Sequence, residues 1–331
     1  MASSQPDAVR RPSPGTVPLA AVDRVELAIV MDNTIDILMA DTEVAKRVLP
    51  RLGPNPFERP QPLAEHGFSV LITVEGDGAA ASVLFDTGVS PRGLLHNIDA
   101  LEIRTAEIQA IVLSHGHADH AMGMNGLLDR LGPRRLPLVL HPDAYLERRL
   151  VFPNGRELNV PPPKRSDLRR ENVELIEEVG PSLLVGGRIL VSGEVARTTD
   201  FEKGFPIHYA RRDGAWVPDP LIPDDQCAIV HLRGKGLVVV TGCGHSGIIN
   251  IIRNARAITG VERVHAVVGG FHLTGGLFEP IIPATIAALQ AIGPRYVVPG
   301  HCTGWSATHQ IARAMPEAFI PNSVGTNFVL A

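Results

Sequence analysis

The sequence is poor in several features that mark specialised classes of protein. It has 3 cysteines in 331 residues, 5% of its residues are aromatic, and 31 basic residues stand against 35 acidic ones. Three cysteines are too few for a disulfide framework, and a net charge of −4 disfavours a nucleic-acid or anionic-membrane surface. No apolar run approaches the roughly 20 residues that a membrane-spanning helix requires. We therefore expect a cytoplasmic protein whose partners include neither nucleic acid nor a membrane.

The remaining composition is that of an ordinary globular protein. Hydrophobic residues make up 44% of the chain and charged residues 20%, so a sizeable core can form. Residues 1–24 carry four prolines and lack the apolar run of a signal peptide. We predict that residues 1–24 form a disordered or loosely attached tail and that residues 25–331 form a single domain.

Short apolar runs separated by turn residues predict the elements of this domain. Phe68–Val74 and Ala81–Phe85 flank Glu75-Gly76-Asp77-Gly78, which is typical of a hairpin turn. Later in the chain, helical spacing over Ile248–Ile258 precedes an apolar strand at Val264–Val268. Hairpins followed by alternating strands and helices favour an α/β architecture of mixed sheets covered by helices.

Residues 141–180 form a charged, proline-rich stretch between these elements. It contains Pro161-Pro-Pro-Lys-Arg165, and its composition predicts an excursion from the domain core. Long excursions in compact domains are often lids or binding loops. A surface insertion without a role is the alternative, and the residues alone leave both open.

The chemistry concentrates in the segment Ser114-His-Gly-His-Ala-Asp-His120. Three histidines and one aspartate lie within six residues, directly after the apolar strand Ile108–Leu113. Imidazole and carboxylate are ligands that suit zinc, iron and manganese. Alternate side chains such as His115 and His117 can point the same way, and Asp119 can approach from the following turn. This arrangement favours two neighbouring metal ions over one.

The same segment, Leu113-Ser-His-Gly-His-Ala-Asp-His120, resembles the H-x-H-x-D-H signature of the metallo-β-lactamase superfamily. Leu84-Phe-Asp-Thr-Gly88 resembles the superfamily's preceding strand-end motif, which implies that Asp86 orients a metal ligand. Further segments are similar to the branch of metal-dependent hydrolases labelled dihydropterin-methyl-ribofuranosylaminobenzene phosphate synthases: Asp32-Asn33-Thr34, Ala64–Ser69, Thr241–His245, Gly269–Leu273 and Pro299–Gly304. The resemblance implies an αββα sandwich of two mixed sheets, with metals at one edge between them.

The remaining metal ligands follow from the resemblance position by position. His301 resembles the last metal-binding histidine, and Cys243 stands where most members have a bridging aspartate. Either Cys243 or the nearby His245 can bind a metal; we favour His245, because a thiolate near solvent is prone to oxidation. The alternative for Cys243 is a small buried residue. The predicted ligands are His115, His117, Asp119, His120, His245 and His301.

The chain departs from the family at the usual middle histidine, where it offers Glu194. Glu194 can bind metal, bind substrate or cap a turn. His272 can contact substrate or metal, and His66 precedes a strand at the same edge. We assign Asp119 and His272 as candidate catalytic residues and leave structural roles open for Glu194, His272 and His66.

These observations together predict a metal-dependent hydrolase. We expect two divalent ions, zinc first and iron or manganese as alternatives, and a metal-bound hydroxide that attacks an ester, lactone or phosphoester of a small molecule. The branch label implies an alternative, a synthase or lyase acting on a pterin and a phosphoribosyl-type partner. An iron-containing redox or binding protein is a second alternative. A homo-oligomer stays open.

Overall fold

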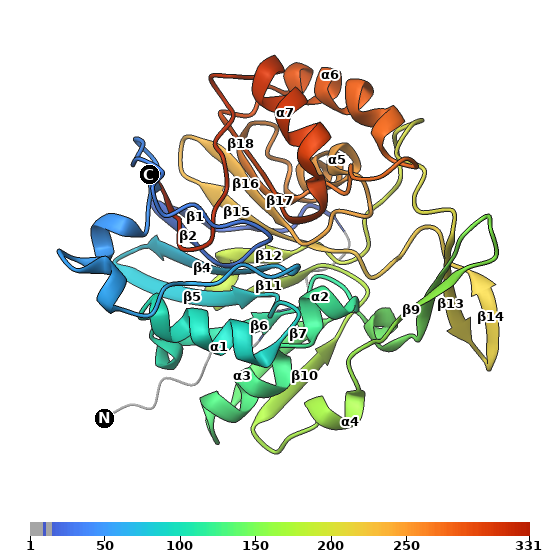
Figure 1. The fold of residues 1–331 in the computed structure, drawn as a ribbon, viewed down its shortest axis with the longest axis horizontal. Helices are drawn as coiled ribbons and strands as arrows, with labels where there is room; N and C mark the ends of the chain where they lie inside the picture. Colours follow the sequence, from blue (N-terminus) through green and yellow to red (C-terminus); the bar gives the residue numbers. More distant parts are fainter. Residues whose placement is uncertain (1–8, 11–14) are drawn as a thin grey trace.

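Two large β-sheets packed face to face form the centre of the molecule, and helices cover both outer faces (Figure 1). The structure, a computed structural model, describes residues 9–10 and 15–331. Within that part of the chain the strands form sheets of eight, seven and four members. The two larger sheets and their helices confirm the predicted αββα sandwich of mixed sheets.

The eight-stranded sheet combines antiparallel and parallel strands. The antiparallel part contains the predicted hairpin, and parallel pairing begins where the strand after the hairpin meets its next neighbour. In spatial order its strands are β10 (Val173–Glu177), β7 (Leu136–Leu140), β6 (Ile108–Val112), β5 (Ala79–Phe85), β4 (Ser69–Gly76), β2 (Arg24–Met31), β19 (Asn327–Leu330) and β3 (Ala45–Lys46).

The seven-stranded sheet ends in three parallel strands, β16, β17 and β18. In spatial order its strands are β11 (Ser182–Leu184), β12 (Ile189–Val191), β15 (Cys227–Leu232), β16 (Gly236–Thr241), β17 (Val264–Gly270) and β18 (Tyr296–Gly300), with β1 (Ala21–Val22) paired to β15. Parallel strands point their carboxyl ends toward one edge, so the residues that follow β16, β17 and β18 come together.

Helices cover the outer face of each large sheet (Figure 1). On the eight-stranded sheet these are α1 (Pro91–Ala100) and α3 (Met124–Leu131), and on the seven-stranded sheet α5 (Ile248–Thr259), α6 (Ile282–Ile292) and α7 (Trp305–Ala314). The shorter α-helices are α2 (Ala118–Ala121) and α4 (Arg165–Leu168). Single 3-10 turns lie at Leu49–Leu52, Pro56–Glu58, Thr105–Glu107, Pro142–Tyr145, Val185–Gly187, Glu279–Ile281 and His301–Thr303.

Alternation along β16 shows how one apolar run serves two layers of the core. Val238 and Val240 are buried between the two large sheets, whereas Leu237 and Val239 are buried on the opposite face beside α5. Successive side chains of a strand point to opposite faces, so a strand covered on both sides reads as a continuous apolar run. The strands that carry the site are therefore held from both sides.

The amino-terminal segment is more ordered than the sequence analysis predicts. Residues 1–8 and 11–14 lie outside the described residues, but Val17 is buried and Val22, in β1, is fully buried. Arg10 forms an isolated bridge with Leu183 at the edge of the seven-stranded sheet. The predicted boundary at residue 25 is thus wrong for the described part of the tail. Because β1 has only two residues, the sequence shows no alternation of apolar and polar residues that would predict a strand there.

The excursion at residues 141–180 is also different from the prediction. Its last part is β10, which pairs in parallel with β7 and belongs to the eight-stranded sheet. Its first part contributes β8 (Arg148–Val151) and β9 (Glu157–Val160), which join β13 (His208–Arg212) and β14 (Ala215–Pro218) in the four-stranded sheet seen at the right of Figure 1. The first part of the excursion is therefore half of a small sheet, and residues 208–218 supply the other half.

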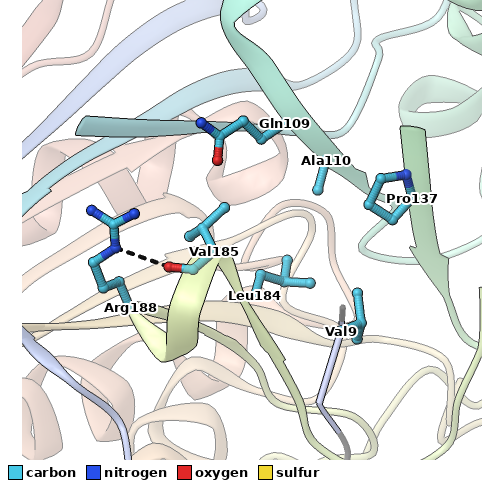
Figure 2. A pocket seen from close by; sticks show the side chains of 7 residues that line it. All are labelled: Val9, Gln109, Ala110, Pro137, Leu184, Val185 and Arg188. Carbon is cyan, nitrogen blue, oxygen red and sulfur yellow. Dashed lines mark hydrogen bonds between the residues drawn. The ribbon is translucent and has the colours of Figure 1, made fainter. Parts of the chain in front are cut away.

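Figure 2 shows a small pocket between the two large sheets, with a volume of about 40 Å³. Gln109 and Pro137 lie near the starts of β6 and β7, and the Arg188 side chain donates a hydrogen bond of 2.9 Å to the Val185 carbonyl. The volume suits one or two water molecules, and no carboxylate or histidine of the described residues lines it. The residues that can carry chemistry lie at the opposite ends of these strands.

No helix in the described part of the chain is long and apolar enough to cross a membrane.

We predict that His265 makes the fold acid-sensitive. Burial, followed by the charges of Lys235, Arg263 and Arg295, lowers its pKa from 6.5 to about 4. The unfolded chain therefore binds the proton more readily, and stability falls as the pH drops from about 6.5 to 4. His265→Gln removes this contribution, so the variant should gain about 3 kcal/mol relative to wild type across that window. Unfolding in urea at a series of pH values checks it; a difference independent of pH would contradict it.

Candidate metal centre

The candidate site lies where five strands end at the same edge of the two large sheets. Because β5 and β6 are parallel, as are β16, β17 and β18, the residues that follow them meet there. The side chains delivered in this way are Asp86 after β5, His115 and His117 after β6, Cys243 and His245 after β16, His272 after β17 and His301 after β18. Short α2 adds Asp119 and His120.

Three histidines form the first group of potential metal donors, which we call the imidazole set. His117 Nδ1 lies 3.1 Å from His245 Nε2, and the donor atoms of His115, His117 and His245 all lie within 4.8 Å of one another. All three rings are buried, and His115 Nε2 has no hydrogen-bond partner among the described residues. Burial, followed by the neighbouring charged groups, lowers the pKa of each well below 6.5. The rings are therefore neutral, the form that binds metals.

Four side chains form a second group, which we call the mixed set. His120 Nε2, His301 Nε2 and Cys243 Sγ lie 3.2–3.3 Å from one another. Asp119 Oδ2 lies 3.2 Å from His301 Nε2 and 3.7 Å from His120 Nε2. Two imidazoles, one carboxylate and one thiol thus converge on a common point.

The residues present fit two divalent metal ions. In a tetrahedral zinc site with zinc–nitrogen distances of about 2.0–2.1 Å, donor atoms lie about 3.3–3.4 Å apart. The separations in the mixed set, 3.2–3.7 Å, are close to this spacing. Donor atoms buried this close together need either a proton or a cation between them, and a bound cation satisfies all of them at once. Nitrogen, oxygen and sulfur donors together suit zinc better than magnesium or calcium.

Asp86 orients two of these histidines from behind. Its Oδ2 accepts hydrogen bonds from His120 Nδ1 at 2.6 Å and from the Ser114 hydroxyl at 2.7 Å. The Ser114 Oγ lies 2.9 Å from His115 Nδ1 and, having donated its own hydrogen to Asp86, can only accept there. Both rings therefore carry a proton on Nδ1 and direct Nε2 toward the site, where it can bind a metal. Asp86 thus has the orienting position that the sequence resemblance implies.

The segment Asp32-Asn33 performs the same task for His301. Asp32 Oδ1 accepts from the backbone N–H of His301 at 2.8 Å, and Asn33 Oδ1 lies 3.1 Å from His301 Nδ1. An amide oxygen only accepts, so the His301 proton lies on Nδ1 and Nε2 faces the mixed set. His301 has a φ of 48° in the left-handed region, a strained conformation that these contacts hold in place.

Asp119 is the carboxylate through which the mixed set reaches solvent. Its side chain is 18% exposed, and His66, which is 70% exposed, lies above it with Nε2 3.6 Å from Asp119 Oδ2. Burial alone would raise the pKa of Asp119, but the charge of His120 and the hydrogen bond and charge of His301 outweigh it and lower the pKa far below 3.8. Asp119 is therefore ionised at neutral pH. His66 lies at the rim of the site, where the sequence analysis placed it.

Cys243 and His245 contribute to different donor sets, although their donor atoms also lie, together with that of His272, within 4.8 Å of one another. The Cys243 side chain enters the mixed set and the His245 side chain enters the imidazole set, because Gly244 between them, with a φ of 73°, turns the chain sharply. Gly242 before them has no room for a side chain, since a Cβ there would lie 2.2 Å from the Ser114 hydroxyl oxygen. The sequence analysis favoured a packing role for Cys243, whereas the structure places its sulfur atom among the potential metal donors.

Glu194 lies outside both donor sets. Its carboxylate is 55% exposed and accepts a hydrogen bond of 3.2 Å from His141 Nε2, since His141 Nδ1 already accepts from the Asp143 backbone. His245 completes a set of three imidazoles without Glu194. Its position outside the donor sets argues against metal binding by Glu194, one of the three roles that the sequence leaves open.

His272 connects the donor sets with a cavity of about 370 Å³. Its ring lies 4.1 Å from that of His245 and 4.5 Å from that of Phe278, and its φ of 43° is again in the left-handed region. His272 Nδ1 has no hydrogen-bond partner among the described residues. The cavity walls are largely apolar and include Phe201, Phe271, Leu273, Leu277 and Phe278 beside the two histidines. A small molecule bound there would lie next to His272 and to His245 of the imidazole set.

The sequence analysis missed His208, which is fully buried with its Nε2 3.1 Å from His117 Nε2. His208 begins β13, far along the chain from the histidine-rich segment. No spacing in the sequence links the two residues, because the four-stranded sheet alone brings them together. A lone histidine in the segment Gly204-Phe-Pro-Ile-His208 carries no local signal of such a role.

Comparisons with known proteins agree with this geometry. A family profile described as the metallo-beta-lactamase superfamily matches residues 64–258. A protein of Methanocaldococcus jannaschii named 7,8-dihydropterin-6-methyl-4-(beta-D-ribofuranosyl)-aminobenzene-5'-phosphate synthase is 32% identical over 77% of this chain and 87% of its own length. An uncharacterized protein of the same organism is 28% identical over 76% of this chain and 88% of its own. The crystal structure of Tm1679, a metal-dependent hydrolase of the beta-lactamase superfamily, matches with a TM-score of 0.69 at 24% identity, covering 93% of this chain and 98% of that one.

We predict that Asn33 controls metal binding by the mixed set. Asn33→Leu removes the acceptor of the His301 Nδ1 proton, so zinc binding there should weaken about 10–100-fold. Asn33→Asp keeps an acceptor at the same atom and should stay within a few fold of wild type. Competition between the protein and a chromogenic chelator for zinc measures both affinities. Equal affinities for wild type and the leucine variant would contradict the orienting role.

Proposed function

We propose that this chain, which belongs to the metallo-β-lactamase superfamily, is a metal-dependent hydrolase that cleaves an ester, lactone or phosphoester of a small molecule. The observation that carries the proposal is the pair of neighbouring donor sets, of which the imidazole set borders a cavity through His245. Enzyme chemistry on this scaffold depends on the site and not on the fold alone, so the residues around the cavity decide the reaction.

The imidazole set would hold one divalent ion and the mixed set a second. Such ions, when bound, lower the pKa of water to about 7 and polarise a carbonyl or phosphoryl oxygen. Three neutral imidazoles form one set, whereas the other adds the Asp119 carboxylate and the Cys243 thiol, so the two sets differ in charge. We propose zinc for both, with iron or manganese as alternatives.

Asp119 and His272 are the groups that we assign to proton handling and orientation. The ionised Asp119 carboxylate can accept a hydrogen bond from a nucleophilic water at the open side of the mixed set. The His272 ring borders the cavity, and its unpartnered Nδ1 can hold the proton that a leaving group receives. His66, at the rim, is placed to contact the part of a substrate that extends toward solvent.

A synthase that joins a pterin to a ribofuranosyl-aminobenzene phosphate is the second candidate. Two observations favour it: the name of the relative that is 32% identical, and the aromatic wall of the cavity. Phe278, which lines the cavity, packs against Phe205 with ring centroids 5.1 Å apart, and both rings lie against His272. Such a wall suits a flat ring, because aromatic faces stack on one another.

We expect the zinc-loaded protein to hydrolyse at least one member of a panel of small-molecule esters, lactones and phosphoesters. Asp119→Ala should lower kcat at least 100-fold, because a positioned acid–base group contributes about that much, while the unfolding midpoint stays close to that of wild type. Asp129→Asn, which removes an exposed carboxylate of α3 paired with Arg170 away from both sets, is the matched control and should keep full activity.

Release of product from the panel and unfolding in urea are the two measurements. Turnover by Asp119→Ala equal to wild type would contradict the assignment. The synthase would be favoured over the hydrolase by two results together. No compound of the panel is hydrolysed, and mass spectrometry detects a condensation product formed from a ribofuranosyl-aminobenzene phosphate and a pterin that carries a leaving group on its methyl carbon.

A further inference from the structure

We propose that His208 is a positioning residue that holds His117 with the lone pair of its Nδ1 directed at His245. The inference rests on the proposed metal-holding role of the imidazole set and adds to it the residue that selects the tautomer of His117. His208 does not belong to either donor set, and its ring is fully buried behind His117.

The hydrogen bonds around His208 can be assigned one after the other. His208 Nδ1 lies 2.9 Å from the backbone carbonyl oxygen of Asp219, which only accepts, so the His208 proton lies on Nδ1. The Asp219 carboxylate is 3.5 Å from the same nitrogen and favours a proton there too. With its hydrogen on Nδ1, His208 offers Nε2 as an acceptor, and this atom lies 3.1 Å from His117 Nε2. The hydrogen between these two nitrogens therefore belongs to His117.

This assignment decides which nitrogen of His117 is available to a metal. With its proton on Nε2, His117 presents the lone pair of Nδ1 to His245 Nε2, 3.1 Å away. In the opposite tautomer, Nδ1 would carry the hydrogen and block the imidazole set. A hydrogen bond at one ring nitrogen of a ligating histidine sets the tautomer and the ring orientation, and such partners contribute about 10–100-fold to metal affinity.

The other histidines that are oriented from behind show the same arrangement. His120 donates to Asp86, His301 to Asn33 and His115 to Ser114. Each of these histidines presents the remaining nitrogen to the donor sets. For His117 the equivalent partner is His208, and the Phe205 ring stacks on His208 at 6.1 Å and 27°.

The four-stranded sheet explains why His208 is held firmly enough to act in this way. His208 is the first residue of β13 and pairs with Leu150 of β8. Arg148, also on β8, donates at 2.5 Å to Asp224, and the second oxygen of that carboxylate accepts from the Gly116 backbone at 2.8 Å. Gly116 separates His115 from His117, so the same small sheet fixes both the backbone and one ring of the histidine turn.

The test compares His208→Leu with His208→Gln, using zinc alone as the probe and the full chain as the protein. Leucine removes the acceptor, so zinc affinity of the imidazole set should fall about 10–100-fold while the mixed set keeps its zinc. Glutamine offers a carbonyl oxygen at a similar reach and should restore affinity to within a few fold. His309→Leu, which removes a histidine on α7 stacked against the exposed Trp305, is the matched control and should behave as wild type.

Chelator competition measures the affinities, and long-range proton–nitrogen NMR of the zinc-loaded wild type with labelled histidine identifies the protonated nitrogen of His117. The proposal expects Nε2–H. A proton on Nδ1 of His117 would overturn it, and so would zinc affinities of the leucine and glutamine variants that both match wild type. Equal losses of zinc affinity in both variants would also overturn it, provided that urea unfolding shows both to be folded. Wild-type protein that binds no zinc would instead overturn the proposed function, so the two failures are distinguishable.

Discussion

The buried carboxylate of Asp86 is the interaction on which the site depends most. It stands at the end of β5 with a φ of 61°, fully buried, and accepts three hydrogen bonds: from the Ser114 backbone, the Ser114 hydroxyl and His120 Nδ1. A buried carboxylate is stable only when such donors surround it. One side chain therefore joins the end of β5 to the turn after β6 and sets the direction of two imidazoles, one in each donor set.

Strain and packing around this carboxylate are concentrated at the same edge of the sheets. Asp86, His272 and His301, each in the left-handed region, all follow strands that enter the site. Residues in this conformation persist only where the surrounding structure holds them, and they cluster at functional sites. The two large sheets, buried on both faces, supply that support. The four-stranded sheet adds a third layer of contacts behind His117, so the histidine turn is held from the β5 side and from the β8 side.

Much of the fold and the centre of the site could be predicted from the sequence, because the relevant signals are local. The apolar runs of β4, β5 and β6 and the histidines directly after β6 are neighbours in the chain. The pairing of residues 148–150 with residues 208–210 is not local, and nothing in either segment predicts it. His208 was missed for that reason. Cys243 and His245, two residues apart, looked like alternatives because a sequence does not show that the glycine between them sends their side chains to different donor sets.

The central claim is that two adjoining metal sites exist and that Cys243 belongs to one of them. Loading the purified protein with cobalt(II) and recording its absorption spectrum, together with elemental analysis, tests this most directly. The account predicts about two equivalents of cobalt and a sulfur-to-cobalt charge-transfer band that disappears in Cys243→Ser, while the imidazole set keeps its ion. One equivalent or less after reconstitution, or two equivalents without the band, would contradict it.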